Sequence, residues 1–186
     1  MILLVIDTQK GITDERLYHF ETLKENIKTL ISAARENHVE VVYVRHDDGP
    51  STGFSLGDEE FEIFEEFAPE GQERIFDKRV NSAFDDSTGL VQYLSEKQEK
   101  TVMVVGLQTN FCIDATIKSG FEHGYKMIVP ENTNSTFDNE YMKKDVCYHY
   151  YNDFVWPERY AECVSMEAAV EMLALAQKTG AKSTDI

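Results

Sequence analysis

Short runs of apolar residues alternate with amphipathic segments along most of the chain. The first run, Met1 to Ile6, contains no polar residue, which is typical of a strand buried on both faces of a sheet. In the next segment, Leu17 to His38, apolar residues recur every three to four positions, as in a helix that packs by one face. Strands that alternate with helices form right-handed β–α–β units with parallel strands. The pattern therefore predicts a doubly wound α/β fold, with helices on both faces of a mostly parallel sheet.

The same pattern predicts where each element lies. We expect a six-stranded sheet, with strands at residues 1–6, 39–44, 74–80, 101–105, 125–129 and 161–164. We expect helices at residues 17–38, 87–98, 110–123, 139–150 and 166–178. Residues 47–73 are irregular apart from an expected amphipathic helix with an acidic outer face at residues 58–67, and residues 182–186 are expected to fray. A chain of 186 residues has the length of one domain, so we expect a single domain over residues 1–186.

The chain is strongly acidic. It has 18 Lys and Arg residues against 34 Asp and Glu residues, a net charge of −16. Such a surface repels phosphate groups, so we expect neither a nucleic-acid partner nor binding to an anionic membrane. No apolar stretch is long enough for a membrane span, and Met1 to Ile6 lacks the basic residues that open a signal peptide. Three cysteines without a C-x-x-C pair disfavour a disulfide scaffold and favour a cytoplasmic protein.

Chemically useful side chains follow several of the predicted strands. Asp7 ends the first strand, Arg45 and His46 the second, and Lys78 lies near the end of the third. Cys112 comes after the fourth strand, on the first turn of a predicted helix. Ligands of open parallel sheets bind beyond the carboxyl ends of the strands, so a carboxylate, an ammonium and a thiol can meet in one crevice. A helix start also favours a thiolate, and this set is sufficient for nucleophilic catalysis.

Each of these residues also has a purely structural interpretation. A small buried cysteine is common in protein cores, so spacing alone leaves the role of Cys112 open. A carboxylate at the end of a buried strand, such as Asp7, can simply pair with a structural cation. Lys78, between Asp77 and Arg79, is by itself typical of a solvated charge.

Other motifs carry less weight. Ser55 fits the G-x-S-x-G pattern, but a turn sequence precedes it in place of the strand that a nucleophile elbow needs. His46 and Asp48 could bind a metal, yet no further histidine follows until position 123, which favours a structural or polar pocket role. Cys147 and Cys163 are interpreted as core or surface thiols. No G-x-G-x-x-G or Walker A motif is present in the sequence.

Four segments, in order, match a known family over about residues 1–175. They are Leu4 to Gln9, Val42 to His46, Lys78 to Phe84, and Val105 to Thr116. In these segments the chain resembles the isochorismatase-like cysteine hydrolases, a superfamily that includes nicotinamidases and N-carbamoyl amidohydrolases. The resemblance implies the doubly wound α/β fold.

The resemblance also implies a catalytic triad of Asp7, Lys78 and Cys112. In that mechanism Asp7 is the general base, Lys78 holds Asp7 and lowers the pKa of the cysteine, and Cys112 forms a thioester. The backbone N–H groups of Gln108 and Cys112 would form the oxyanion hole, and the peptide bond between Leu107 and Gln108 is expected to be cis. No cofactor is implied, and a homo-oligomer, a dimer or larger, is expected by resemblance only.

Departures from the family pattern narrow the chemistry. The metal-binding histidines of nicotinamidases are missing after His46, so we expect no metal. Retention of Cys112 favours hydrolysis of a C–N bond in a small amide or ureide. Two alternatives stay open: an isochorismatase-type enol-ether hydrolase, which needs no thiol, and a catalytically silent binding protein on the same fold.

Four residues near the triad in sequence are expected to line the substrate pocket. They are Gln9, Asn81, Phe84 and Phe111. An aromatic wall suits a small planar amide or ureide. Phe84 and Phe111 are equally compatible with a place in the core.

Overall fold

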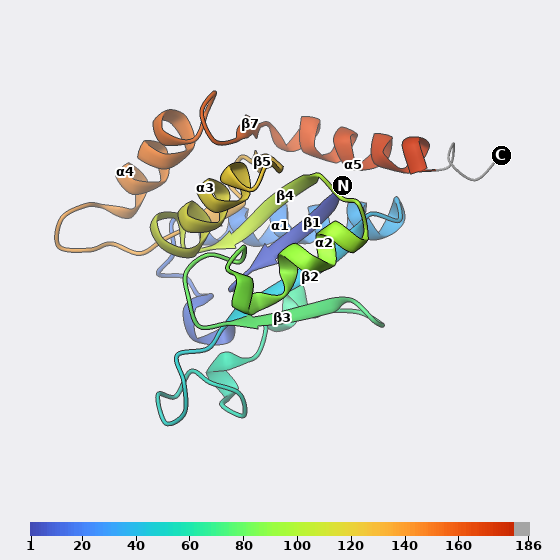
Figure 1. Cartoon of the computed structure of the whole chain (residues 1–186). Helices are drawn as coiled ribbons and strands as arrows, with labels where there is room; N and C mark the ends of the chain where they lie inside the picture. The colour runs from blue at the N-terminus through green and yellow to red at the C-terminus, as the bar shows by residue number, and fades with distance from the viewer. Residues whose placement is uncertain (181–186) are drawn as a thin grey trace.

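The computed structural model describes residues 1–180, with side chains to residue 176, and shows a central sheet of parallel strands (Figure 1). The strand order is β3-β2-β1-β4-β5-β7, and every pairing is parallel. The six strands are β1 (Ile2–Ile6), β2 (Glu40–His46), β3 (Arg74–Lys78), β4 (Thr101–Leu107), β5 (Lys126–Pro130) and β7 (Glu162–Val164). The six predicted strands are thus confirmed. The expectation for residues 182–186 lies outside the described residues.

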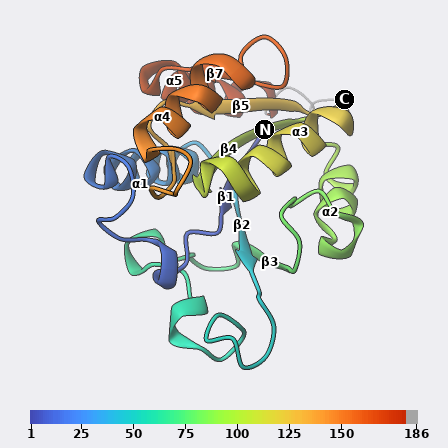
Figure 2. The same ribbon diagram turned by 90° about the vertical axis from the view of Figure 1, so that its left-hand side faces the viewer.

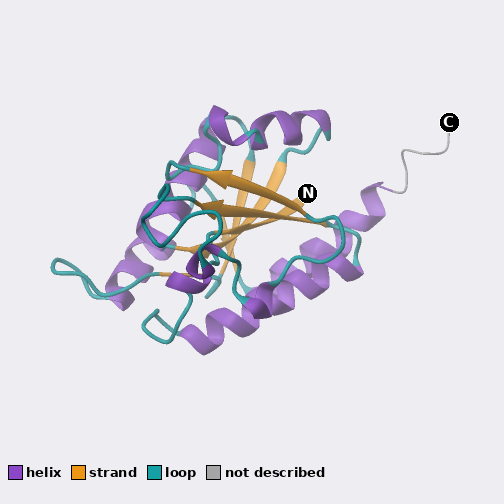
Figure 3. Cartoon of the chain, turned by 90° about the horizontal axis from the view of Figure 1, so that it is seen from below, coloured by secondary structure: helices purple, strands orange, loops and turns teal. Residues whose placement is uncertain are grey.

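Helices cover both faces of this sheet, as predicted (Figures 2 and 3). They are α1 (Phe20–Glu36), α2 (Leu90–Glu96), α3 (Asp114–Glu122), α4 (Lys144–His149) and α5 (Met166–Gly180). Helices α1 and α5 share one apolar core with the sheet, and α2 and α3 share the other. Within the described residues, no helix combines the length and apolar character needed to cross a membrane.

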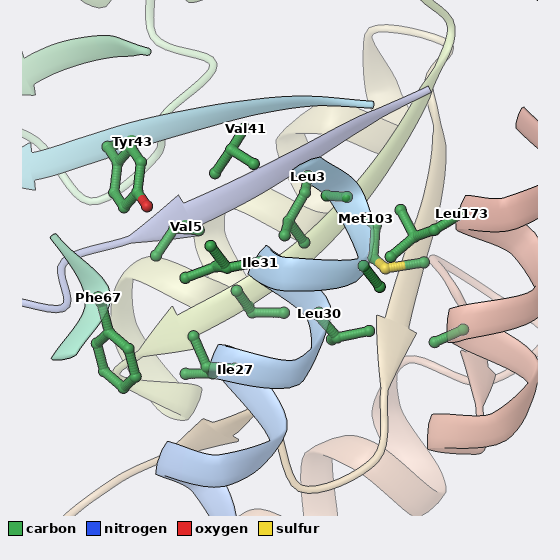
Figure 4. Packing of buried hydrophobic residues seen from close by; sticks show 14 of the residues in the cluster. Leu3, Val5, Ile27, Leu30, Ile31, Val41, Tyr43, Phe67, Met103 and Leu173 are labelled. Carbon is green, nitrogen blue, oxygen red and sulfur yellow. The ribbon is translucent and has the colours of Figure 1, made fainter. Parts of the chain in front are cut away.

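Strand β1 shows why the first apolar run lacks a polar residue. Leu3 and Val5 point to one face and pack with Ile27 and Leu30 of α1 (Figure 4). The alternate residues of the strand, among them Leu4, belong to the core on the opposite face. Burial of one such side chain contributes about 1.5–3 kcal/mol, so a polar substitution on either face of β1 is costly.

One predicted helix is wrong. Residues 58–67 form two separate 3-10 turns, Glu59–Phe61 and Glu65–Phe67, with an extended stretch between them. In that stretch Phe64 N–H donates to the Thr8 carbonyl at 2.8 Å, and Ile63 forms an antiparallel bridge with Gln9. These backbone hydrogen bonds to the segment after β1 are incompatible with a continuous helix.

Other helix boundaries move for local reasons. The helix expected from residue 110 begins as a π-helical turn, Thr109–Ile113, ahead of α3. The helix expected from residue 139 begins only at Lys144, because the Asn139 side chain accepts hydrogen bonds from the N–H groups of Tyr141 and Met142 and closes a turn. A seventh strand, β6 (Asn134–Ser135), pairs with β4 and is too short to leave a sequence pattern.

Gly106 in β4 is required by the close contact between β1 and β4. Its φ is 124°, and a Cβ atom there would clash with the Ile6 backbone. We predict that Gly106→Ala lowers the free energy of unfolding by at least about 3 kcal/mol, because overpacking and backbone strain add. Gly124→Ala is the control, since its φ is 80° but no atom lies within 4 Å of the new Cβ, and we expect a loss of about 1 kcal/mol. Equal urea midpoints for the two variants would contradict this account.

Candidate active site

Four neighbouring strands, β3-β2-β1-β4, bring one polar group each to the same edge of the sheet. Lys78 is the last residue of β3 and lies in register with His46, the last residue of β2. Asp7 follows β1, and Cys112 lies in the π-helical turn after β4. The structure therefore brings together Asp7, Lys78 and Cys112, as the strand ends predict.

The ammonium of Lys78 is the centre of this group. Its side chain is fully buried, and Nζ lies 2.8 Å from Asp7 Oδ2. The same nitrogen lies 3.1 Å from His46 Nδ1 and 3.2 Å from Cys112 Sγ. An ammonium has three protons to donate, so each one has an acceptor here. The interpretation of Lys78 as a solvated charge is wrong, because its side chain is buried. A buried cation is tolerated only where it is paired and hydrogen-bonded, as it is here.

Asp7 is almost fully buried and has a left-handed backbone conformation, with φ 50°. Its N–H donates to the Val44 carbonyl at 2.8 Å, which fixes the residue beyond the strand end. Oδ1 has no hydrogen-bond partner among the described residues. Burial raises the pKa of Asp7, and the charge of Lys78 opposes that shift. A carboxylate with a raised pKa and a free oxygen is well suited to accept a proton.

The pKa of the Cys112 thiol is shifted in the direction opposite to the one expected from the sequence. Burial raises its pKa to about 12, the Asp7 carboxylate adds to the shift, and Lys78 only partly opposes it. The expected lowering of this pKa is therefore wrong for the resting site. Desolvation of a thiolate outweighs the attraction of one cation that is already shared with a carboxylate. With its pKa raised in this way, Cys112 needs a base to form the thiolate.

A cavity of about 200 Å³ opens above these groups. Its lining residues are Asp7, Ile12, His46, Asp48, Phe54, Asn81, Gln108, Phe111 and Cys112. Two of the residues expected in the substrate pocket, Asn81 and Phe111, are among them. The expected cis peptide bond between Leu107 and Gln108 is also present.

Two predicted pocket residues lie elsewhere. Phe84 is buried in the core, with its ring against Tyr125 and the exposed His123. Gln9 is also fully buried, and its amide is committed to backbone groups of His46 and Phe61. A position close to the triad in sequence does not show whether a side chain points into the cavity or into the core.

The sequence did not single out Ile12 and Phe54, which line the cavity from irregular segments without a motif. The sequence is compatible with a pocket role or with metal binding for His46 and Asp48, and both lie on the cavity wall. The position of His46 at a strand end was the available signal.

The donor atoms of Asp7, His46 and Cys112 lie within 4.8 Å of one another, a spacing that could hold a metal ion. Lys78 Nζ is hydrogen-bonded to all three of these residues. The ammonium thus occupies the place of the cation, and this donor set does not fit a metal.

The other candidate nucleophiles lie outside the cavity. Ser55 donates a hydrogen bond of 2.5 Å to Asp47, which holds the pKa of that carboxyl at about 2, and the serine helps to fix the loop. Cys147 is buried in α4, and Cys163 is half-buried in β7. Neither thiol is among the lining residues of the cavity.

Comparison with known proteins agrees with this geometry. The sequence model of the Isochorismatase domain matches residues 1–171. The chain belongs to the isochorismatase family. It is a hydrolase of that family, and the match covers every strand of the sheet and all the cavity-lining residues.

Relatives within the isochorismatase family include both characterised and uncharacterised proteins. The chain is 30% identical over 138 residues to the uncharacterized isochorismatase family protein YrdC of Bacillus subtilis, covering 73% of each chain. It is 27% identical over 156 residues to Nicotinamidase 3 of Arabidopsis thaliana, covering 74% of each. The crystal structure of a cysteine hydrolase from Pseudomonas syringae superposes with a TM-score of 0.85 at 22% identity, covering 94% of this chain and 92% of the other, which shows the shared fold.

We predict strong coupling between Lys78 and Asp7 in the stability of this isochorismatase-family chain. Lys78→Met leaves the buried Asp7 carboxylate without its cation and should cost about 3–5 kcal/mol of unfolding free energy. Adding Asp7→Asn removes that charge, so the double variant should be more stable than Lys78→Met alone. Urea denaturation of both single variants and the double variant measures the coupling. Simple addition of the two single losses would contradict the pairing.

We also predict slow, pH-dependent alkylation of Cys112. With a pKa of about 12, its reaction with iodoacetamide should accelerate close to tenfold per pH unit between about pH 7 and pH 9. Asp7→Asn removes a negative charge beside the thiol, lowers its pKa and should speed alkylation by about threefold or more. Mass spectrometry of the Cys112 peptide measures the rate. A plateau below pH 8, or slower alkylation in Asp7→Asn, would show that the electrostatics are wrong.

Proposed function

We propose that the protein hydrolyses a non-peptide C–N bond in a small amide or ureide, through a thioester on Cys112. One observation carries the proposal: the Cys112 thiol lies in the wall of an open cavity, beside a buried carboxylate with an unpartnered oxygen. Lys78 contacts both groups and offsets the charge that builds up during the reaction. Nucleophile, base and cation therefore converge where a substrate carbonyl can reach them.

The steps follow from these positions. Asp7 accepts the thiol proton, and the Cys112 sulfur attacks the carbonyl carbon to form a tetrahedral oxyanion. The backbone N–H groups of Gln108 and Cys112 are proposed to stabilise that oxyanion. Asp7 then gives its proton to the leaving nitrogen, the C–N bond breaks, and ammonia or an amine departs. Water, deprotonated by Asp7, hydrolyses the thioester and restores the thiol.

The shape of the cavity supports a small substrate. Its volume of about 200 Å³ is below the range of pockets that hold drug-sized ligands. Phe54 and Phe111 contribute aromatic surface, and Phe111 is half exposed. Aromatic walls suit a planar group such as an amide. The name of the relative Nicotinamidase 3 also supports amide hydrolysis.

The test is ammonia release from a panel of small amides, carbamoyl compounds and ureides. We predict release by the wild-type protein and a loss of about 10⁴-fold or more in Cys112→Ala, as for other nucleophile deletions. Asp7→Asn should also be inactive, because protonation of the leaving nitrogen fails even though its thiol alkylates faster. Cys147→Ala is the matched control, since that thiol lies outside the cavity, and it should hydrolyse like the wild type.

Equal release by the wild type and Cys112→Ala would refute the thiol mechanism. Hydrolysis of an enol ether that survives Cys112→Ala but not Asp7→Asn would favour the isochorismatase-type reaction. Absence of activity on the amide panel and on enol ethers would favour a binding protein.

A further inference from the structure

His46 uses both of its ring nitrogens inside the protein. Nδ1 lies 3.1 Å from Lys78 Nζ, and Nε2 lies 3.1 Å from Asp48 Oδ1. A lysine ammonium can only donate, so Nδ1 must be the unprotonated acceptor. The proton of the neutral ring is then on Nε2, which faces the Asp48 carboxylate. The chain of contacts fixes a single tautomer of His46.

The backbone of His46 is fixed as well. The Gln9 side-chain amide accepts a hydrogen bond from His46 N–H at 2.7 Å and donates to the His46 carbonyl at 2.9 Å. Gln9 itself is fully buried and also donates to the Phe61 carbonyl. This double contact holds the end of β2 in place next to Asp7, two residues before Gln9.

We propose that His46 is a positioning residue: it supplies the third acceptor of the Lys78 ammonium and so holds that ammonium between Asp7 and Cys112, while Gln9 and Asp48 fix its backbone and tautomer. Without His46, one proton of a buried cation loses its acceptor, and the ammonium is no longer confined to one position. Such an arrangement matters because a small displacement of Lys78 changes its contact with the thiol and with the base together.

The same geometry argues against direct substrate contact by the His46 nitrogens. Nδ1 is hydrogen-bonded to Lys78, Nε2 lies against the Asp48 carboxylate, and only 21% of the side chain is exposed. Asp48 differs, since 54% of its side chain is exposed at the cavity wall. The consequence for catalysis rests on the proposed function, whereas the effect on the Cys112 thiol does not.

The experiment compares His46→Asn with His46→Leu. The amide oxygen of asparagine lies near the place of Nδ1 and can accept from Lys78, whereas leucine fills similar space without an acceptor. His123→Leu is the control, because this exposed histidine lies at the end of α3 and is not among the residues that line the cavity. Urea denaturation confirms that each variant is folded. The readouts are the alkylation rate of Cys112 by iodoacetamide and, on the amide that the wild type hydrolyses fastest, kcat and KM.

We expect His46→Leu to slow alkylation by about threefold or more and to lower kcat by about 10- to 100-fold with little change in KM, because a hydrogen bond to a charged group is lost. His46→Asn should recover most of both losses, and His123→Leu should match the wild type. Equal behaviour of His46→Leu and His46→Asn would overturn the proposal. So would a rise in KM at unchanged kcat, which would make His46 a substrate contact. If no amide is hydrolysed, the proposed function fails, and the alkylation rates still decide the role of His46.

Discussion

The buried ammonium of Lys78 is held by Asp7, His46 and Cys112, and the geometry of the site depends on that interaction. Removal of a charge from water costs several kcal/mol, so it persists only where hydrogen bonds replace the lost hydration. The parallel sheet makes this possible, because adjacent strands end together and place the side chains at or after their ends near one point. The cation in turn opposes the rise in the pKa of Asp7 that burial causes, and the carboxylate lies beside the thiol whose proton it is proposed to take.

The centre of the sheet could be predicted from the sequence because its strands β1, β2, β4 and β5 are largely buried on both faces. A short apolar run such as Met1 to Ile6 is best explained by a buried strand. The amphipathic segments between such runs predict helices that connect parallel strands. The failures have tertiary causes. Residues 58–67 have an apolar pattern compatible with a helix, yet hydrogen bonds to Thr8 and Lys10 hold them extended between two short turns. Propensity is a weak guide where a distant backbone segment competes for the same groups.

The site was predictable to the extent that strand ends mark it. Asp7, Lys78 and Cys112 follow from their positions, whereas Gln9 and Phe84 were assigned to the pocket because they lie near the triad in sequence. The structure shows one bound to backbone groups and the other in the core. The pKa of Cys112 was misjudged for a related reason: the helix start and the lysine are visible in sequence, but the depth of burial is not.

The central claim is that a neutral Cys112 thiol, deprotonated by Asp7, becomes covalently acylated. The most direct measurement is acid quenching of the enzyme during turnover of its fastest amide, followed by peptide mass spectrometry. The account predicts that the acyl group of the substrate is found on the Cys112 peptide, that it disappears when substrate is exhausted, and that it is absent from Asp7→Asn. An acyl group on another residue, or rapid product formation with no adduct on Cys112 at any quench time, would contradict it.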